Sequence, residues 1–294
     1  MLKIARPRRS VLYMPGSNAR ALEKGRTLAA DGLILDLEDA VAPDAKETAR
    51  DQIRGAIKEG GYGKRELIVR VNSMDTSWGH DDLAEAATMG ADAGLLPKVE
   101  SAGTVYQAEA ILETSGAPSD LAIWCMMETP LGMLHAEEVS EASPRVGALV
   151  MGTSDLAKDL HCAHTRDRLP FITSLGLCML AARAAGIAIL DGVHLDLEDD
   201  EGFEHACRQG AEMGFDGKTL IHPKTIDAAN KAFSPSSEEI EWSKKIIAAH
   251  AEAAGEGKGI VVVDGKLVEN LHVLNAERLV AMAEAITELA APAN

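Results

Sequence analysis

The chain has 294 residues, of which 46% are hydrophobic and 26% are charged. This composition is typical of a folded protein with a large core, and no apolar stretch is long enough to predict a membrane span. The net charge of −17 argues against general nucleic-acid binding, which requires a basic face. The basic start lacks the apolar run of a signal peptide, and the four cysteines show no paired spacing. We therefore expect a cytoplasmic protein with reduced thiols and no membrane or nucleic-acid partner.

Short apolar runs recur along the chain, and each is followed by a helical pattern. The runs are nearly continuous rather than alternating, which is typical of parallel strands buried on both faces. Ser17 or Asn18 can cap the first helix and Asp44 the second. The eight runs lie at 10–14, 32–37, 66–71, 93–97, 121–127, 147–151, 186–190 and 217–221.

Eight strand–helix units in order predict an α/β protein with a (β/α)8 barrel over residues 1–230. A doubly wound open sheet is the alternative, but the chain lacks its Gly-rich dinucleotide fingerprint. Residues 231–294 form a different pattern: a helix at 236–254 opened by a Ser236/Glu239 capping box, a Gly-rich stretch at 255–259, a short β run at 260–263, and a last helix at 271–289. We interpret this segment as a C-terminal helical extension, either a lid or a packed helix pair.

Two carboxylates, Glu128 and Asp155, follow successive apolar runs one repeat apart. If these runs are neighbouring parallel strands, both acids lie at one end of the barrel, where barrel enzymes place their chemistry. Two hard oxygen ligands with room for water suit Mg2+. Other polar residues end most of the remaining strands: Asp36, Glu38, Asp39, Arg70, Asn72, Lys98, Asp191 and His222.

Strand alternation places Asp36 and Glu38 on one face, together with Glu128 if the strands align. Several acids that face one space repel each other unless a cation lies between them, which favours a metal. Structural ion pairing of Arg70 with Asp36 or Glu38 is the competing explanation. His161, Cys162 and His164 lack a second pair at zinc-finger spacing, so we expect a loop there, and His194 is as easily structural as acid–base.

The first 30 residues are strongly basic, which can attract a small anionic ligand or can be a solvated terminus. The only acidic residue among them is Glu23. The basic residues are Lys3, Arg6, Arg8, Arg9, Arg20, Lys24 and Arg26.

Several segments together resemble the citrate lyase β-subunit-like family of the HpcH/HpaI aldolase superfamily, and within it the malyl-CoA and citramalyl-CoA lyases. The resemblance covers nearly the whole chain. The matching segments are RSVLYMPGSN at 9–18, DLEDAV at 36–41, RVN at 70–72, LPKV at 96–99, ETPLG at 128–132, GTSDL at 152–156, IHP at 221–223 and DGKLV at 264–268.

The resemblance implies that Glu128 and Asp155 bind Mg2+, for which Mn2+ can substitute. It implies that Arg70 faces the substrate oxygens, that Asp36, Glu38 and Asp39 hold metal-bound waters, and that Arg20 and Lys24 meet the phosphates of coenzyme A. It also implies a homotrimer or homohexamer in which the C-terminal element covers a neighbouring site. Many lyases of the family carry an acid–base Asp just after the DGK turn, where this chain has Glu269.

The activity implied is that of a carbon–carbon lyase, which splits malyl-, methylmalyl- or citramalyl-CoA into acetyl- or propionyl-CoA and glyoxylate or pyruvate. A malyl-CoA thioesterase built on the same site is an alternative. Others are a citrate lyase β subunit acting on a carrier protein and a CoA-independent aldolase, against which the basic first unit and the tail motif argue. The Glu at 269 could shift the balance between cleavage and hydrolysis.

Overall fold

The computed structural model describes residues 6–255 and 260–291. The chain forms two compact units. One spans Arg8–Phe233, and the other consists mainly of the residues after Phe233. The Gly-rich stretch, apart from Gly255, and the basic Lys3 lie outside the described residues. No helix in the described ranges is long and apolar enough to cross a membrane.

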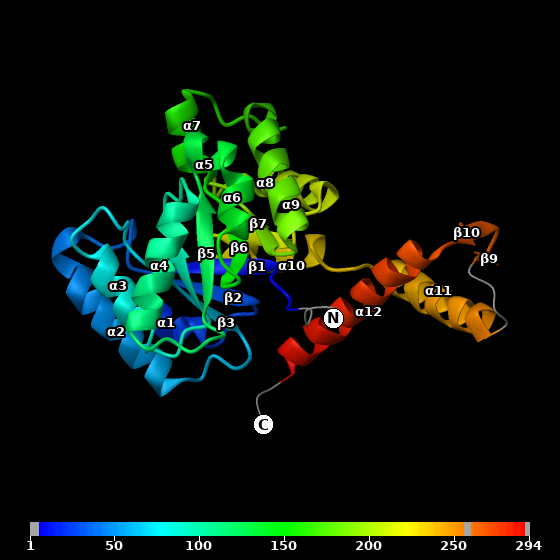
Figure 1. The fold of residues 1–294 in the computed structure, drawn as a ribbon, viewed down its shortest axis with the longest axis horizontal. Coiled ribbons are helices and arrows are strands. Elements are labelled where there is room, and N and C mark those ends of the chain that lie inside the picture. The colour runs from blue at the N-terminus through cyan, green and yellow to red at the C-terminus, as the bar shows by residue number, and fades with distance from the viewer. Residues whose placement is uncertain (1–5, 256–259, 292–294) are drawn as a thin grey trace. The chain divides into compact units, whose positions relative to one another are not determined.

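The first unit is a closed barrel of eight parallel strands in sequential order, surrounded by helices (Figure 1). This confirms the predicted (β/α)8 fold, and each predicted strand overlaps an observed one. The strands are β1 Ser10–Pro15, β2 Gly32–Asp36, β3 Glu66–Arg70, β4 Ala93–Leu96, β5 Ala122–Met127, β6 Val146–Met151, β7 Ala188–Asp191 and β8 Gly217–Leu220.

The connections between the strands carry the α-helices and three short 3-10 turns. The helices are α1 Ala19–Gly25, α2 Lys46–Glu59, α3 Gly79–Ala86, α4 Ala102–Thr114, α5 Pro130–Leu134, α6 Ala136–Glu141, α7 Thr153–Leu160, α8 Ile172–Ala185, α9 Asp200–Met213 and α10 Ile226–Ala232. The 3-10 turns are η1 Pro43–Ala45, η2 Leu169–Phe171 and η3 Pro223–Thr225.

The predicted N-terminal cap is correct for α1 and wrong for α2. The Asn18 side chain accepts a hydrogen bond from the backbone N–H of Ala21 and caps α1, as predicted. The prediction that Asp44 caps α2 is wrong. Asp44 lies inside η1, and α2 begins after Ala45 with no side-chain cap.

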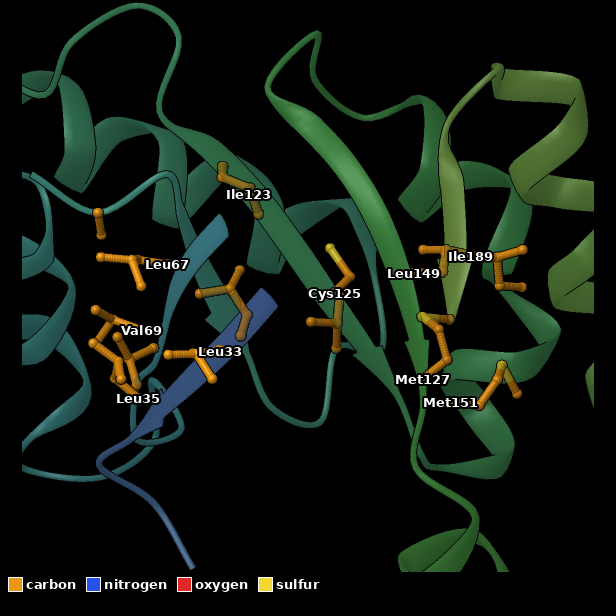
Figure 2. Packing of buried hydrophobic residues seen from close by; sticks show 14 of the residues in the cluster. Leu33, Leu35, Leu67, Val69, Ile123, Cys125, Met127, Leu149, Met151 and Ile189 are labelled. Atoms are coloured by element: carbon orange, nitrogen blue, oxygen red, sulfur yellow. The ribbon is translucent and has the colours of Figure 1, made fainter. Parts of the chain in front are cut away.

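Side chains of each strand alternate between two apolar layers, as buried parallel strands require. The barrel interior contains Ile34, Ile68, Leu95, Trp124 and Val150 among others. The outer layer packs against the helices, and Figure 2 shows its sulfur-rich part, where Cys125, Met127 and Met151 project from β5 and β6. All four cysteines are free, and Cys125, Cys178 and Cys207 are buried.

The C-terminal unit contains α11 Ser237–Gly255, a two-stranded antiparallel sheet and α12 Asn270–Ala290. The sheet is formed by β9 Val261–Val263 and β10 Lys266–Val268, joined by a turn at Asp264 and Gly265, both of which have positive φ. Ser236 and Glu239 form the predicted capping box at the start of α11. This unit has its own small core of Ile246, Val263, Val268, Val273 and Ala276.

Candidate active site

The carboxyl ends of β1, β2, β3, β5, β6, β7 and β8 contribute residues to a cavity of about 130 Å3. Its lining combines polar and apolar side chains, so the cavity can hold a charged group next to a hydrocarbon surface. The polar side chains are Tyr13, Asp39, Arg70, Glu128, Thr153, Ser154, Asp155 and Thr219. The apolar side chains are Met126, Met151, Val193 and Ile221.

Arg70, one of the polar side chains of the cavity, lies beside Asp36 because strand register pairs the two positions. Its Nε and Nη2 donate to the two oxygens of Asp36 at 2.7 and 2.6 Å, and Nη1 lies 2.7 Å from Oε2 of Glu38. Its guanidinium also lies 4.8 Å from the centre of the Tyr13 ring. Burial opposes the charge, but the carboxylates outweigh it and raise the pKa of Arg70, so this cation is permanent.

Asp36 therefore positions Arg70. Its oxygens also accept the backbone N–H groups of Glu38 and Ala40, which leaves both oxygens engaged. The ion pairing that competed with the metal interpretation is thus present for Asp36 and Glu38. The two explanations are compatible, because among the described residues Glu128 and Asp155 contact Lys98 rather than Arg70 and remain as a separate acidic pair.

Glu128 is buried at the end of β5, where its Oε1 accepts the backbone N–H of Lys98 at 2.8 Å. Burial raises its pKa to about 7, although the Lys98 hydrogen bond opposes the rise. Gly152, which directly follows β6, lies beside it. A Cβ at position 152 would lie 2.4 Å from Glu128 Cβ and 2.6 Å from Oε2, so only glycine lets the two strands bring this carboxylate into the cavity.

Asp155 lies in the first turn of α7 and is 27% exposed. Its Oδ1 is 3.9 Å from Nζ of Lys98 and 4.0 Å from Nζ of Lys158. Ser154 also lines the cavity, and its Oγ is buried and has no hydrogen-bond partner in the part of the chain that the structure describes. An unsatisfied buried hydroxyl in a cavity that two carboxylates also line marks a place for a polar ligand.

We refer to Asp36, Glu38, Asp39, Glu128, Asp155, Arg70 and Lys98 as the rim cluster. Its five carboxylates outnumber the cations that contact them, which are Arg70, Lys98 and Lys158. This surplus of negative charge and the hard oxygen donors fit Mg2+. No group of three or more Asp, Glu, His or Cys residues suited to a metal occurs within the described ranges, so any ion here would take two carboxylates and complete its shell with water or substrate.

Lys46 and Asn72 stabilise the loop after β2, which carries Glu38 and Asp39, by hydrogen bonds to its backbone. The buried Lys46 ammonium donates to the backbone carbonyls of Leu37 and Glu38, and thereby fixes the loop that carries the acids. Asn72 donates to Leu37 O and to Asp82. Sequence reasoning missed Lys46 because a lysine in the first turn of a helix carries no sign of burial.

Asp191 is not part of the rim, contrary to its placement from the sequence. Leu190 faces the barrel interior, so Asp191 points to the helices. There it accepts hydrogen bonds from Lys218 Nζ at 2.8 Å and Arg168 Nη1 at 2.7 Å. We name these three residues the wall cluster. Burial would raise the pKa of Asp191, but Lys218 and Arg168 lower it overall.

The remaining candidates lie at separate places. Arg20 and Lys24 are exposed one turn apart on α1, the helix that follows the carboxyl end of β1. His222 is exposed, and its ring accepts the backbone N–H of Lys224. Glu269 belongs to the C-terminal unit, where it forms a capping box with His272 at the start of α12. Tyr13 and Thr219 line the cavity and were missed, since neither is charged.

Known proteins share this fold and these segments. Residues 9–223 match the HpcH/HpaI aldolase/citrate lyase family. A (3S)-malyl-CoA thioesterase of Cereibacter sphaeroides is 52% identical over 98% of this chain and 98% of its own length. An L-malyl-CoA/beta-methylmalyl-CoA lyase of that organism is 36% identical, with 96% of each chain covered.

The likeness extends to solved structures. Protein CitE from Mycobacterium tuberculosis, in complex with magnesium, acetoacetate and coenzyme A, superimposes with a TM-score of 0.75 at 28% identity, covering 95% of this chain and 98% of that one. The chain therefore belongs to the HpcH/HpaI aldolase/citrate lyase family and has its citrate lyase β-like form.

Proposed function

We propose that the protein hydrolyses the thioester of (3S)-malyl-CoA, or of a close 3-hydroxyacyl-CoA analogue, in a Mg2+-dependent reaction at the rim cluster. The observation that carries this proposal is the cavity lined by the acidic pair Glu128 and Asp155 together with the apolar side chains of Val193 and Ile221. A short hydroxy acid with a metal-bound carboxylate matches this mixed lining. The choice of hydrolysis is supported by the 52% identical thioesterase.

Glu128 and Asp155 are the proposed ligands of the ion. Bound Mg2+ would act as a Lewis acid toward a substrate oxygen. Glu128 enters the site with one oxygen already bonded to the Lys98 amide, so Oε2 is the oxygen that remains for a ligand. The Ser154 hydroxyl is placed to hydrogen-bond the substrate or a water beside the acids.

Arg70 supplies a fixed positive charge for the oxygen that becomes negative in the reaction. Asp36 and Glu38 hold its guanidinium in one orientation, and the Tyr13 ring supports it. In hydrolysis, water oxygen adds to the thioester carbonyl carbon, the C–S bond breaks, and the sulfur leaves as the thiol with a proton from water. The products are malate and coenzyme A.

Coenzyme A extends beyond the cavity. A space of about 130 Å3 equals roughly four water volumes, which suits the acyl end alone. Arg20 and Lys24 are the proposed phosphate contacts, because they place two exposed cations on one face of α1.

Carbon–carbon cleavage is the second candidate, favoured by the 36% identical lyase. In that reaction the substrate hydroxyl loses its proton to a base and becomes the carbonyl of glyoxylate or pyruvate, while the bond between its carbon and the neighbouring carbon breaks. The acyl-CoA enolate that leaves then takes up a proton. Glu269 is the proposed proton donor on a lid, and a trimer or hexamer remains the expected assembly. Carrier-dependent citryl cleavage is a third outcome that the same assay distinguishes.

Product analysis decides between these reactions. The purified chain is incubated with malyl-, methylmalyl- and citramalyl-CoA and Mg2+, and products are separated chromatographically. Malate and free CoA without glyoxylate establish hydrolysis, whereas glyoxylate and acetyl-CoA establish cleavage. Turnover only after a carrier protein is added points to the citrate lyase type.

The site assignment has its own variants. Glu128→Gln and Asp155→Asn should each lower kcat/KM by at least about a thousandfold, equivalent to about 4 kcal/mol. Asp159→Asn is the matched control, because Asp159 lies on α7 one turn from Asp155 and pairs with Lys158 outside the cavity. Full activity in both site variants would overturn the assignment.

A further inference from the structure

Lys98 has an unusual backbone for a residue with a side chain. It follows β4 with a φ of 50°, in the left-handed region that L-residues rarely adopt. Strain of this kind persists where surrounding contacts impose it, and such places cluster at functional sites. Here the conformation directs the Lys98 N–H to Oε1 of Glu128 at 2.8 Å.

Whereas the backbone of Lys98 contacts Glu128, its side chain contacts Asp155, the other acid of the pair. Its ammonium lies 3.9 Å from Oδ1 of Asp155 and 3.5 Å from Oε1 of Glu38. One residue therefore touches both proposed metal ligands, one through its backbone and the other through its ammonium.

We propose that Lys98 is a placeholder cation of the metal site, whose amide orients Glu128 and whose ammonium occupies part of the space and charge that a divalent cation would take. An ion bound to Asp155 would lie within a few ångströms of this ammonium and would be repelled by it. Mg2+ then binds against a built-in competitor, and its affinity is lower than the two carboxylates alone would give. The inference rests on the proposed metal site at Glu128 and Asp155.

The test is the affinity of the metal-free chain for Mg2+ by titration calorimetry, repeated with Mn2+ by electron paramagnetic resonance. Lys98→Met keeps the amide, shortens the unbranched side chain by one atom and removes the charge. We expect it to bind both ions about tenfold more tightly, which corresponds to about 1.4 kcal/mol. Lys98→Gln should show the same direction, and it provides a second variant if Lys98→Met does not fold.

Lys158→Met is the matched control. Lys158 lies 4.0 Å from the same oxygen of Asp155, but its side chain is 75% exposed, against 40% for Lys98. Within the described residues its ammonium pairs with Asp155 and Asp159, and not with Glu128. Solvent screens such a pair, so its removal should change the affinity less than twofold.

Each result has one meaning. Tighter binding in Lys98→Met alone supports the proposal, because general damage to the site can only weaken binding. Equal or weaker binding than wild type overturns it, as does equal tightening by Lys158→Met. If wild-type protein binds neither ion and Glu128→Gln behaves identically, the proposed metal site itself fails.

Discussion

The barrel contains two buried clusters of charge that differ in balance and in surroundings. In the wall cluster, Lys218 and Arg168 together outnumber the single carboxylate of Asp191, and all three lie between a strand and the outer helices. In the rim cluster, carboxylates outnumber cations, and the surplus faces a cavity. Both oxygens of Asp191 accept hydrogen bonds from Lys218 or Arg168, although Arg168 Nη2 has no hydrogen-bond partner in the described part of the chain. The rim cluster instead leaves carboxylate charge for a ligand to neutralise.

The balance of charge in each cluster distinguishes charged residues that stabilise the fold from those that bind a ligand better than their burial does. Asp191 is more deeply buried than Asp155 and has shorter ion-pair contacts, yet it does not line the cavity. The pKa shifts point the same way. The partners of Asp191 lower its pKa, while burial raises that of Glu128. Because the two pKa values shift in opposite directions, replacing each acid by its amide should change the stability of the fold in opposite directions.

The largest expected effect is on stability at the wall cluster. Asp191→Asn leaves Lys218 and Arg168 buried without their carboxylate, and we expect the free energy of unfolding to fall by about 3–5 kcal/mol. Urea unfolding measures it. Asp155→Asn is the control, since a partly exposed carboxylate with contacts near 4 Å should change stability by less than about 1 kcal/mol. Equal losses in both variants would remove the distinction between the clusters.

Neutralising Glu128 should have the reverse effect on stability. The folded state raises the pKa of this acid from 4.5 to about 7, so between these values the folded chain binds more protons than the unfolded chain. The stability of the metal-free protein therefore falls as pH rises through this window, and the loss is complete above about pH 7. Glu128→Gln should stabilise the metal-free protein by up to about 3 kcal/mol at pH 8 and have no such effect at pH 4.

Thermal unfolding at both pH values, without divalent ions, measures this effect. Wild-type protein with Mg2+ should recover much of the difference, because an ion that binds only the folded state stabilises it. If Glu128→Gln is less stable than wild type at pH 8, the charged form of Glu128 is stabilised by its surroundings, as that of Asp191 is, and the prediction is wrong.

The apolar side chains of the cavity should control the acyl substituent. Val193→Ala removes two methyl groups facing the acyl end, and the ratio of kcat/KM for methylmalyl-CoA over malyl-CoA should rise about tenfold. Leu195→Ala is the control, since Leu195 is exposed and lies outside the cavity lining. An unchanged ratio in Val193→Ala would place the substituent elsewhere.

The smallest effect is expected on α1. Replacing Arg20 and Lys24 together by Ala should raise KM for the CoA ester about fivefold and leave the Mg2+ affinity unchanged, because exposed cations contribute little each. Salt should raise the wild-type KM and affect the double variant less. Arg208→Ala, an exposed cation on α9, provides the comparison. If Arg208→Ala raises KM as much as the double replacement of Arg20 and Lys24 does, the phosphates of coenzyme A bind elsewhere.

Much of the fold follows from local sequence pattern. The continuous apolar runs located all eight strands, and the Asn18 cap and the Ser236/Glu239 box were correct because each depends on residues within one turn. Asp44 failed because Pro43 starts a 3-10 turn that shifts the helix start. Asp191 failed because a position at a strand end does not reveal which face the side chain takes.

The parts of the site that could not be predicted arise from contacts between distant segments. The Lys98 amide reaches a residue 30 positions away, and its φ has no sequence signal, because left-handed backbone is ordinarily the property of Gly or Asn. The pairing of Arg70 with Asp36 was foreseen as a possibility, but strand register alone decides it. Whether Glu269 works as a lid residue stays a prediction.

Gly152 has a consequence for how this scaffold can diversify. Its missing side chain is the space that Glu128 occupies, so substitution there would displace the carboxylate rather than tune it. Val193 and Ile221 line the same cavity without a comparable close contact to Glu128. We therefore expect natural or laboratory variation to change the size of the pocket at these two positions and to leave position 152 as glycine.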